Sequence, residues 1–257
     1  MRRGRRIRTR RSEGGLIPFD IALDALGDGG SMGRRSTDVP LDQVVGSVAR
    51  WEDFDGDFRP RARHLDSRLR RLQSAHASGE PLPPVDLVQL GDLYFVADGH
   101  HRVAVARAAG QLMIAARVLS ICTVAYGMAC LRLAHFGSKA AERSFLDRVP
   151  LPDDVRRDLW LDRPAEWMRL ADAAESWGYR HALVHGRPMD RPELAMTWWK
   201  DEVRPVLEQL RTAGAGLDLR DVELYATAIA VRDRDGFTGW PDDLDQRVLE
   251  FGTLTSA

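Results

Sequence analysis

The chain has 257 residues, of which 44% are hydrophobic and 29% are charged. These proportions are typical of a globular protein and exclude a wholly disordered chain. Charged residues interrupt every apolar run before it reaches the ~18 residues of a membrane span, so we expect no membrane contact and a cytoplasmic location. The length predicts one large domain or two modest ones.

The net charge of −1 conceals an uneven distribution of charge. Residues 1–11 contain seven arginines, and without them the net charge falls from −1 to −8. A basic arm on an acidic body is not typical of a DNA-binding fold, whose folded part usually carries the positive patch. We predict that residues 1–36 form a disordered basic tail and linker, which could contact nucleic acid weakly through its arginines.

Neither the cysteines nor the glycine-rich stretch of the sequence marks a functional site. Cys122 and Cys130 are too few for a disulfide scaffold or a zinc site with four cysteines, and we predict two buried, reduced thiols. Residues 24–33 are rich in glycine but lack the Gly-Lys-Ser/Thr end of a phosphate loop. We interpret them as part of the linker.

The ordered part is predicted to begin near residue 37, with a short strand and turn at 39–46. An arginine-rich helix follows at about 60–77, because three leucines form an apolar stripe at helical spacing. Residues 85–90 and 93–97 are predicted as the strands of a hairpin, joined by a tight Gly-Asp turn. A helix opens at 98–102 and ends at Gly110, and a further strand is predicted at 112–121.

Beyond residue 122 the hydrophobic pattern is typical of helices. We predict an apolar helix at 123–138 and amphipathic helices near 153–160, 164–178, 191–213 and 219–231. The tryptophans of this region are predicted to be core or interface anchors. The chain is therefore predicted to have an α+β fold, with a small mixed sheet and helices at 37–122, a mostly helical region at 123–245 and a tail at 246–257.

The segment 98–102, Asp-Gly-His-His-Arg, joins a predicted strand to the start of a helix. The first N–H groups of a helix have no partner within it and carry a partial positive charge, so a helix start attracts anions. Gly99 allows the backbone to approach a ligand closely, and Arg102 can hold two phosphate oxygens with its planar guanidinium. The segment therefore favours a phosphate site.

The other side chains of the segment can take part in chemistry. His100 and His101 can donate hydrogen bonds or transfer protons near neutral pH. Asp98 can bind magnesium or fix a histidine tautomer. These are the groups that phosphoryl transfer uses for positioning and charge stabilisation. Spacing alone supports equally an ordinary helix start, in which Asp98 caps the helix and the polar side chains face water.

The segment 85–110, with its strand, hairpin, strand, Asp-Gly-His-His-Arg turn and alanine-rich helix, resembles the ParB/sulfiredoxin superfamily. It is similar to the second conserved box of ParB N-terminal domains, where a turn begins a helix beneath nucleotide phosphates. The Asp-Gly-His-x-Arg form resembles that of ParB-like free serine kinases. The resemblance covers about residues 37–122, and the remainder is similar to the helical part of actinobacterial ParB-like proteins.

This resemblance implies further site residues in the segment 46–54. Arg50 would correspond to the arginine that ParB places near the nucleotide. Glu52, Asp53 and Asp55 would be candidates for a metal-holding or general-base carboxylate, as in the serine kinases, and Glu52 is the one we assign to catalysis. The resemblance also implies Gly99, His100, His101 and Arg102 as nucleotide contacts, with Asp98 as the metal ligand.

The chain departs from the superfamily pattern at three points. The third ParB box is not recognisable at 120–128, which places the CTP-clamp mechanism in doubt. The helix–turn–helix domain of ParB is not evident either. Sulfiredoxin has a catalytic cysteine at the position of His100, so we do not expect reduction of sulfinic acids.

The leading functional prediction is a nucleotide-binding protein that carries out phosphoryl transfer or hydrolysis, as a kinase or NTPase. Its cofactor would be ATP, ADP or CTP with magnesium, its acceptor a small hydroxyl metabolite, and its assembly a homodimer. A second interpretation is a non-catalytic ParB-like regulator or DNA-associated adaptor that uses the basic tail. A nuclease is the least favoured, because no set of paired carboxylates for two metal ions is evident.

Overall fold

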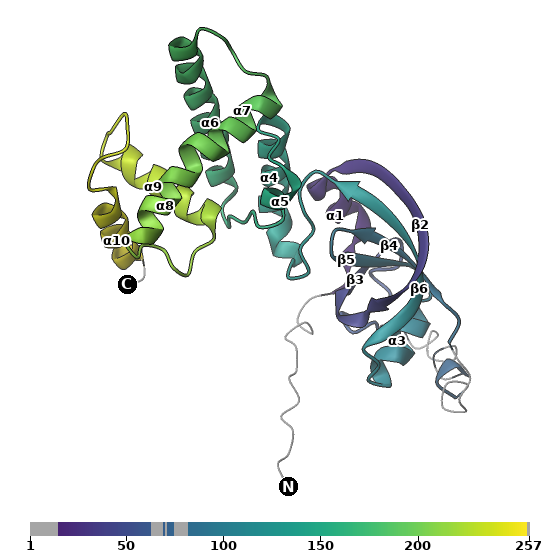
Figure 1. The fold of residues 1–257 in the computed structure, drawn as a ribbon. Helices are drawn as coiled ribbons and strands as arrows, with labels where there is room; N and C mark the ends of the chain where they lie inside the picture. The colour runs from purple at the N-terminus through teal and green to yellow at the C-terminus, as the bar shows by residue number, and fades with distance from the viewer. Residues whose placement is uncertain (1–14, 63–68, 70, 75–81, 256–257) are drawn as a thin grey trace. The chain divides into compact units, whose positions relative to one another are not determined.

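The computed structural model describes residues 15–62, 69, 71–74 and 82–255. The chain divides into two compact units, Met1–Phe136 and Gly137–Ala257, shown from purple to yellow along the chain in Figure 1. The boundary between sheet and helical parts therefore falls after Phe136 rather than after residue 122. Within the described residues, every helix is too short or too polar to cross a membrane.

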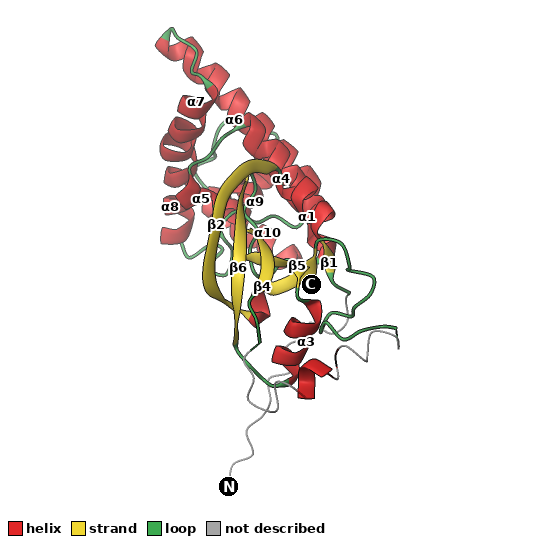
Figure 2. Ribbon diagram, turned by 90° about the vertical axis from the view of Figure 1, so that its right-hand side faces the viewer, coloured by secondary structure: helices red, strands yellow, loops and turns green. Residues whose placement is uncertain are grey.

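The first unit contains a mixed six-stranded sheet, drawn in yellow in Figure 2. Its strands are β1 (Ile17–Pro18), β2 (Asp28–Pro40), β3 (Val44–Ser47), β4 (Val85–Leu90), β5 (Leu93–Asp98) and β6 (Met113–Thr123). They lie in the order β1-β3-β5-β4-β6-β2. The pairs β2–β6 and β4–β5 are antiparallel, and the other three pairs are parallel. Together with the helical second unit, this sheet confirms the predicted α+β class.

The central hairpin forms where the sequence predicts it. In β4 the side chains of Val85, Leu87, Val88 and Leu90 are buried, and the strand pairs with β5 from Leu90 opposite Leu93. Apolar side chains from both strands enter one core cluster with residues of β2, β3 and β6. The helix α3 (His100–Ala108) follows β5 directly and buries Val103, Ala104 and Ala106 in the same cluster.

The N-terminal segment is more ordered than predicted. The described residues of the expected tail and linker form β1, the helix α1 (Phe19–Leu26) and most of β2. Helix α1 buries Ala22, Ala25 and Leu26. Strand β2 pairs with β6 along its length, yet of its 13 residues only Val39 is buried. Because backbone pairing rather than side-chain burial forms this edge strand, its composition is that of a linker.

The prediction of an apolar helix at 123–138 is wrong. Strand β6 continues to Thr123, and a loop follows before the short 3₁₀ turn Leu133–His135 and the helix α4 (Phe136–Arg148). The Tyr126 hydroxyl donates to Asp92 Oδ1 over 2.7 Å, and the Asp92 amide donates to the Gly127 carbonyl over 2.7 Å. These bonds hold the loop against the β4–β5 hairpin, and tertiary contact therefore overrides helical propensity.

Most of the helix predicted at 60–77 lies outside the described residues, although 71–74 are helical.

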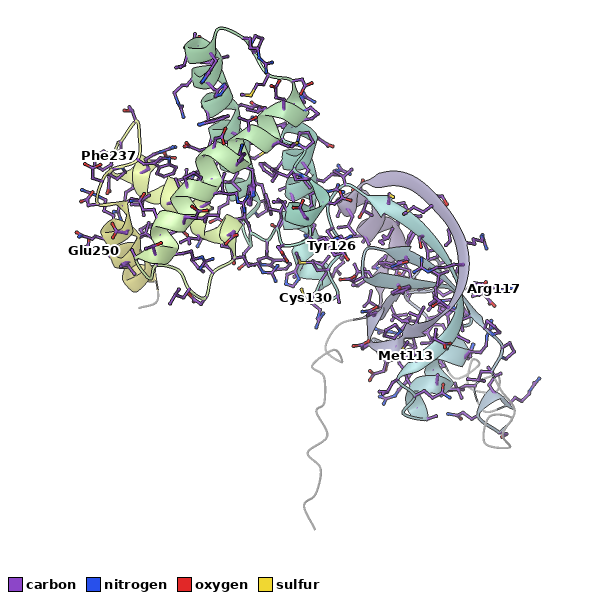
Figure 3. All side chains as sticks on the ribbon, in the orientation of Figure 1. Met113, Arg117, Tyr126, Cys130, Phe237 and Glu250 are labelled. Atoms are coloured by element: carbon purple, nitrogen blue, oxygen red, sulfur yellow. The ribbon has the colours of Figure 1, made fainter. Side chains whose placement is uncertain are left out.

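The thiols are also placed differently from the prediction. Cys122 and Cys130 are both exposed, and Figure 3 labels Cys130 in the loop that follows β6. Strand β6 alternates exposed and buried side chains only as far as Val118, and Cys122 lies beyond this alternation, near the end of the strand.

The second unit is helical. After α4 it contains α5 (Asp153–Arg156), α6 (Pro164–His185), α7 (Arg191–Trp198), a π-helical turn (Trp199–Val203), α8 (Arg204–Thr212), α9 (Asp221–Arg234) and α10 (Leu244–Thr255). The segment predicted as one helix at 191–213 is thus divided by the π-turn. The tail predicted at 246–257 lies largely within α10.

Aromatic rings form the centre of the second unit. Trp198 contacts Phe145 and Tyr225 edge-on, at centroid distances of 6.5 and 5.6 Å, and Trp167 lies 5.5 Å from Phe145. Trp167 and Trp198 are buried, as predicted for core anchors. Burial of such large rings contributes strongly to the stability of a helical unit.

Candidate functional site

All the predicted site residues except Glu52 meet at a small cavity, of about 40 Å³, where β5 passes into α3. It is lined by Arg50, Leu72, Asp98, Gly99, His100, His101 and Arg102. All the residues predicted at 98–102 are therefore together, and Arg50 joins them from the segment that follows β3. Glu52 does not line this cavity.

Gly99 makes the turn from strand to helix. Its φ of +103° lies in the left-handed region, and a Cβ atom there would be 2.6 Å from Val85 Cγ1. Its carbonyl accepts from the amides of Arg102 and Val103, at 2.8 and 3.0 Å. Because glycine has no side chain, the helix start is left without a side-chain cap. The positive end of the α3 dipole thus adjoins the cavity.

Arg102 is held firmly beside this helix start. Its guanidinium forms an ion pair with the Asp98 carboxylate and donates to the carbonyls of Pro83 and Pro84, at 3.2 and 2.5 Å. The Arg102 side chain is 16% exposed, whereas that of Asp98 is 66% exposed. Arg102 is therefore a fixed positive charge, and Asp98 is the accessible member of the pair.

Arg50 supplies a second positive charge. Its Nε donates to Asp53 Oδ2 over 2.7 Å, and its guanidinium lies over the Phe54 ring, 5.2 Å from the centroid. Its backbone amide donates to the Ser47 hydroxyl over 2.9 Å. Hydrogen bonds from both its backbone and its side chain thus fix the chain at Arg50, at the edge of the cavity.

The two histidines are buried rather than exposed to solvent. His100 and His101 are only 4% and 5% exposed. The Nε2 atom of His100 shares a 2.7 Å hydrogen bond with the Ser47 hydroxyl, and its ring stacks on Phe54 at 5.1 Å. The ring of His101 meets the same phenylalanine edge-on at 5.4 Å. Phe54 therefore packs against both histidines and fixes their orientation.

The pKa of His100 is lowered from 6.5 to about 4. Burial is the main cause, and the Arg50 charge has a larger effect in the same direction than the Asp98 charge has in the opposite one. The imidazole is therefore neutral at pH 7. A neutral ring can hydrogen-bond a ligand or accept a proton, but it adds no positive charge to the site. The positive charge at this cavity comes from the two arginines.

The lowered pKa of His100 predicts how the stability of the protein depends on pH. Because the folded state holds this ring neutral, the unfolded state binds more protons between pH 6.5 and about 4, and stability is lost as pH falls through that range. From pH 7 to pH 5 the free energy of unfolding should fall by about 2 kcal/mol through this group. The direct check is an NMR titration of the His100 ring. A midpoint near 6.5 would contradict it.

Glu52, the predicted catalytic carboxylate, belongs to a different cavity of about 730 Å³ in the first unit. Its walls are largely apolar and include Ile21, Val44 and Trp51, with Arg61 and Arg132 also lining it. The predicted site is therefore split. Arg50 lines the small cavity at the helix start, whereas Trp51 and Glu52 line the large one.

Two residues of the small site were not predicted. Ser47 and Phe54 both lie in the segment 46–54 that the resemblance indicates, but neither has a side chain that marks it as functional. Ser47 is separated from its partner His100 by 53 positions. Only the parallel pairing of β3 with β5 brings the two residues together.

Asp98 stands apart from other candidate metal ligands. Across the part of the chain that the structure describes, no three or more His, Cys, Asp or Glu side chains are grouped so that they could hold a metal ion. Magnesium is commonly held by one or two carboxylates together with substrate phosphates. The exposed Asp98 is a single carboxylate of this kind, and it would hold magnesium only together with a bound phosphate.

The chain matches no protein-family model, and no curated protein matches it. Among solved structures, sulfiredoxin from Arabidopsis thaliana is similar over 34% of this chain and 88% of its own, at 15% identity and a TM-score of 0.27. A Pnob8-like ParB-N domain is similar over 87% of this chain and 97% of its own, at 10% identity and a TM-score of 0.24. Similarities this weak assign neither a family nor an activity to this chain.

Proposed function

We propose that this protein binds a nucleotide through its phosphates at the start of α3. The observation that carries the proposal is the convergence of Arg50, Arg102 and the uncapped helix start on one cavity. Two guanidinium groups beside the positive end of a helix dipole form a common arrangement for an oxyanion. The alternative of a fully solvated helix start fits less well, because Arg102 is largely buried and both histidines are packed beneath the turn.

The size of the cavity limits which part of the ligand enters it. A volume of about 40 Å³ is room for roughly three water molecules. A phosphate group fits such a space, and a nucleoside does not. The base and ribose of ATP, ADP or CTP would therefore lie outside it, and selectivity among nucleotides would come from other residues.

Phosphoryl transfer or hydrolysis is the finer proposal. Arg50 and Arg102 would hold phosphate oxygens, and magnesium bound by Asp98 would neutralise phosphate charge. The neutral His100, or His101 beside it, would be the group that moves a proton. The acceptor would be water or a small hydroxyl metabolite. In this arrangement Glu52 has no role at the phosphate site, because it lines the other cavity.

One observation favours a second candidate, a nucleotide-binding regulator without catalysis. The His100 imidazole is engaged by Ser47 and stacked on Phe54, which is the environment of a packed structural side chain. A protein of this kind would bind nucleotide at the same turn and release it unchanged. Product analysis after incubation with nucleotide distinguishes the two candidates.

The test is a thermal-shift panel of ATP, ADP and CTP, each with magnesium or EDTA. A ligand present at about 100 times its Kd adds about 2.7 kcal/mol to the stability of the unit that binds it. The unfolding midpoint should then rise by roughly 5–10 °C. Arg102→Gln should lose the shift, whereas Arg34→Gln, at an exposed position on β2, should keep it. If no nucleotide shifts the wild-type midpoint, the proposal fails.

Asp98→Asn separates the two roles that Asp98 can have. If the carboxylate only pairs with Arg102, its removal releases the guanidinium, and phosphate affinity should rise equally in magnesium and in EDTA. If Asp98 holds magnesium, affinity in magnesium should fall while affinity in EDTA rises. We expect the second result, because the Asp98 side chain is the exposed member of the pair.

A further inference from the structure

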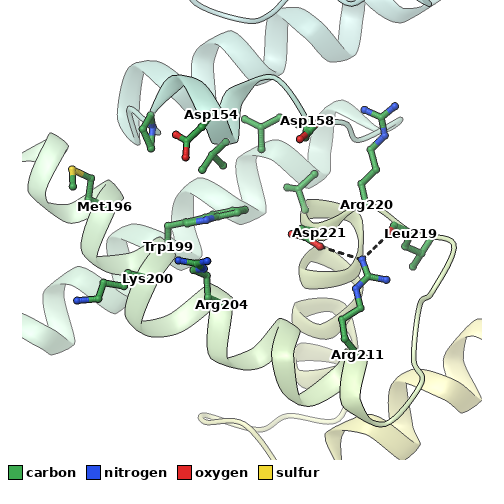
Figure 4. A pocket seen from close by; sticks show the side chains of 14 residues that line it. Asp154, Asp158, Met196, Trp199, Lys200, Arg204, Arg211, Leu219, Arg220 and Asp221 are labelled. Atoms are coloured by element: carbon green, nitrogen blue, oxygen red, sulfur yellow. Dashed lines mark hydrogen bonds and ion pairs between the residues drawn. The ribbon is translucent and has the colours of Figure 1, made fainter.

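The second unit has a cavity of its own, of about 750 Å³, shown in Figure 4. This volume lies within the usual range of small-molecule sites. The cavity is bordered by the segment around α5, by the π-turn with the start of α8, and by the start of α9. None of the residues that form it belongs to the nucleotide site proposed above.

Two acidic and two basic side chains line this cavity on different sides. Asp154 and Asp158 lie on the α5 side, and Lys200 and Arg204 lie on the side of the π-turn. Among the described residues, none of these four side chains takes part in an ion pair. Charges of opposite sign that border one cavity without pairing are available to a ligand that carries both signs.

The remaining charged residues of the cavity are already engaged. Arg211 donates to Asp221 over 3.1 Å and to the Leu219 carbonyl over 2.6 Å, as the dashed lines in Figure 4 mark. Arg220 lies over the Trp160 ring, 5.7 Å from its centroid. Arg211, Asp221 and Arg220 thus already have partners within the protein. The charges left to contact a ligand are those of the two aspartates, Lys200 and Arg204.

An aromatic ring lies between the two charged sides. In Figure 4 the Trp199 indole extends across the cavity, with the aspartates on one side of it and Arg204 on the other. Trp199 begins the π-turn. Pro205 has no N–H to donate back along the helix, which accounts for the break in regular α-helical bonding here. Single π-turns in helices are frequent at functional sites.

We infer that this cavity binds a small organic zwitterion with a planar apolar body, of the size of an aromatic amino acid or a dipeptide. Its cationic group would lie at Asp154 and Asp158, and its anionic group at Lys200 and Arg204. Its ring would lie against the Trp199 indole, where aromatic rings associate favourably. The flanking Met196, which is 62% exposed, offers further adaptable apolar surface.

Three probes that share one ring test this assignment by calorimetry on the full-length protein. L-Tryptophan carries both charges, tryptamine only the cation, and indole-3-propionate only the anion. L-Tryptophan should bind saturably at up to millimolar concentration, at least about tenfold more tightly than either single-charge probe, a difference of 1.4 kcal/mol. Equal affinity for all three probes, or no binding of L-tryptophan, would overturn the inference.

Double substitutions then test which side chains contact the cationic group and which contact the anionic group of the ligand. Asp154→Asn with Asp158→Asn should weaken tryptamine and L-tryptophan about tenfold and leave indole-3-propionate unchanged. Lys200→Gln with Arg204→Gln should weaken indole-3-propionate and L-tryptophan and leave tryptamine unchanged. All four side chains are exposed, so the variants should fold normally. The matched controls are Arg169→Gln and Asp242→Asn, at exposed positions outside the cavity. A loss of affinity that does not follow this crossed pattern would show that the probes bind elsewhere.

Discussion

Replacing Lys139 with methionine is expected to lower the free energy of unfolding of the second unit by about 3–5 kcal/mol. Lys139 Nζ lies 2.6 Å from Glu142 Oε2, and the two side chains are only 2% and 1% exposed. Methionine fills a similar volume but removes the lysine charge that pairs with the buried glutamate. Breaking a buried ion pair by removing one member costs far more than losing an exposed ion pair.

Urea unfolding followed by tryptophan fluorescence measures this effect, because six of the seven tryptophans lie beyond residue 136. The double variant Lys139→Met with Glu142→Leu removes both charges and should recover most of the loss. Arg187→Met breaks an exposed pair with Glu193 and should change stability by less than about 1 kcal/mol. A single Lys139 variant as stable as the wild type would show that this ion pair is not needed.

Gly46→Ala should destabilise the first unit by about 3 kcal/mol, at the upper end of the effects of overpacking. An added Cβ would lie 2.2 Å from the Ile17 carbonyl oxygen and 2.6 Å from Phe95 Cδ1. Gly46 pairs with Ile17 across β1 and β3, so the strands would have to separate. The change also moves Ser47, the partner of His100, and thus reaches the candidate site.

Thermal unfolding followed by circular dichroism, with hydrogen exchange of the β3 amides, checks this prediction. Gly30→Ala is the matched control, because Gly30 has a φ of +96° but open space where a Cβ would be. That variant carries backbone strain without a clash and should cost roughly 1 kcal/mol. Equal losses in the two variants would mean that close packing at Gly46 is not the cause.

Local patterns were sufficient to predict the part of the fold that carries the site. The alternation of apolar residues around the Gly-Asp turn gives the β4–β5 hairpin its register, and glycine at position 99 provides the sharp entry into α3. These features depend on residues close in sequence. Residues 98–102 therefore line one cavity, and their role as a site stays a prediction.

The errors arise where distant contacts decide the structure. Strand β2 is stabilised by backbone pairing with β6, which leaves no hydrophobic pattern in its own sequence. The loop after β6 is apolar enough to suggest a helix, but it bonds to the β4–β5 hairpin instead. Pro205 could have indicated the break near residue 203. The Ser47–His100 hydrogen bond depends on strand pairing that no local pattern encodes.

We propose above all that Arg102 and Arg50 recognise phosphate groups at the start of α3. The most direct measurement is calorimetric titration of wild-type protein and Arg102→Gln with ATP, ADP and CTP in magnesium, beside adenosine and cytidine. We predict saturable binding of at least one nucleotide, no measurable binding of either nucleoside, and a loss of at least about 30-fold in Arg102→Gln, equivalent to about 2 kcal/mol. Equal affinity for nucleoside and nucleotide, or unchanged nucleotide affinity in the variant, would contradict it.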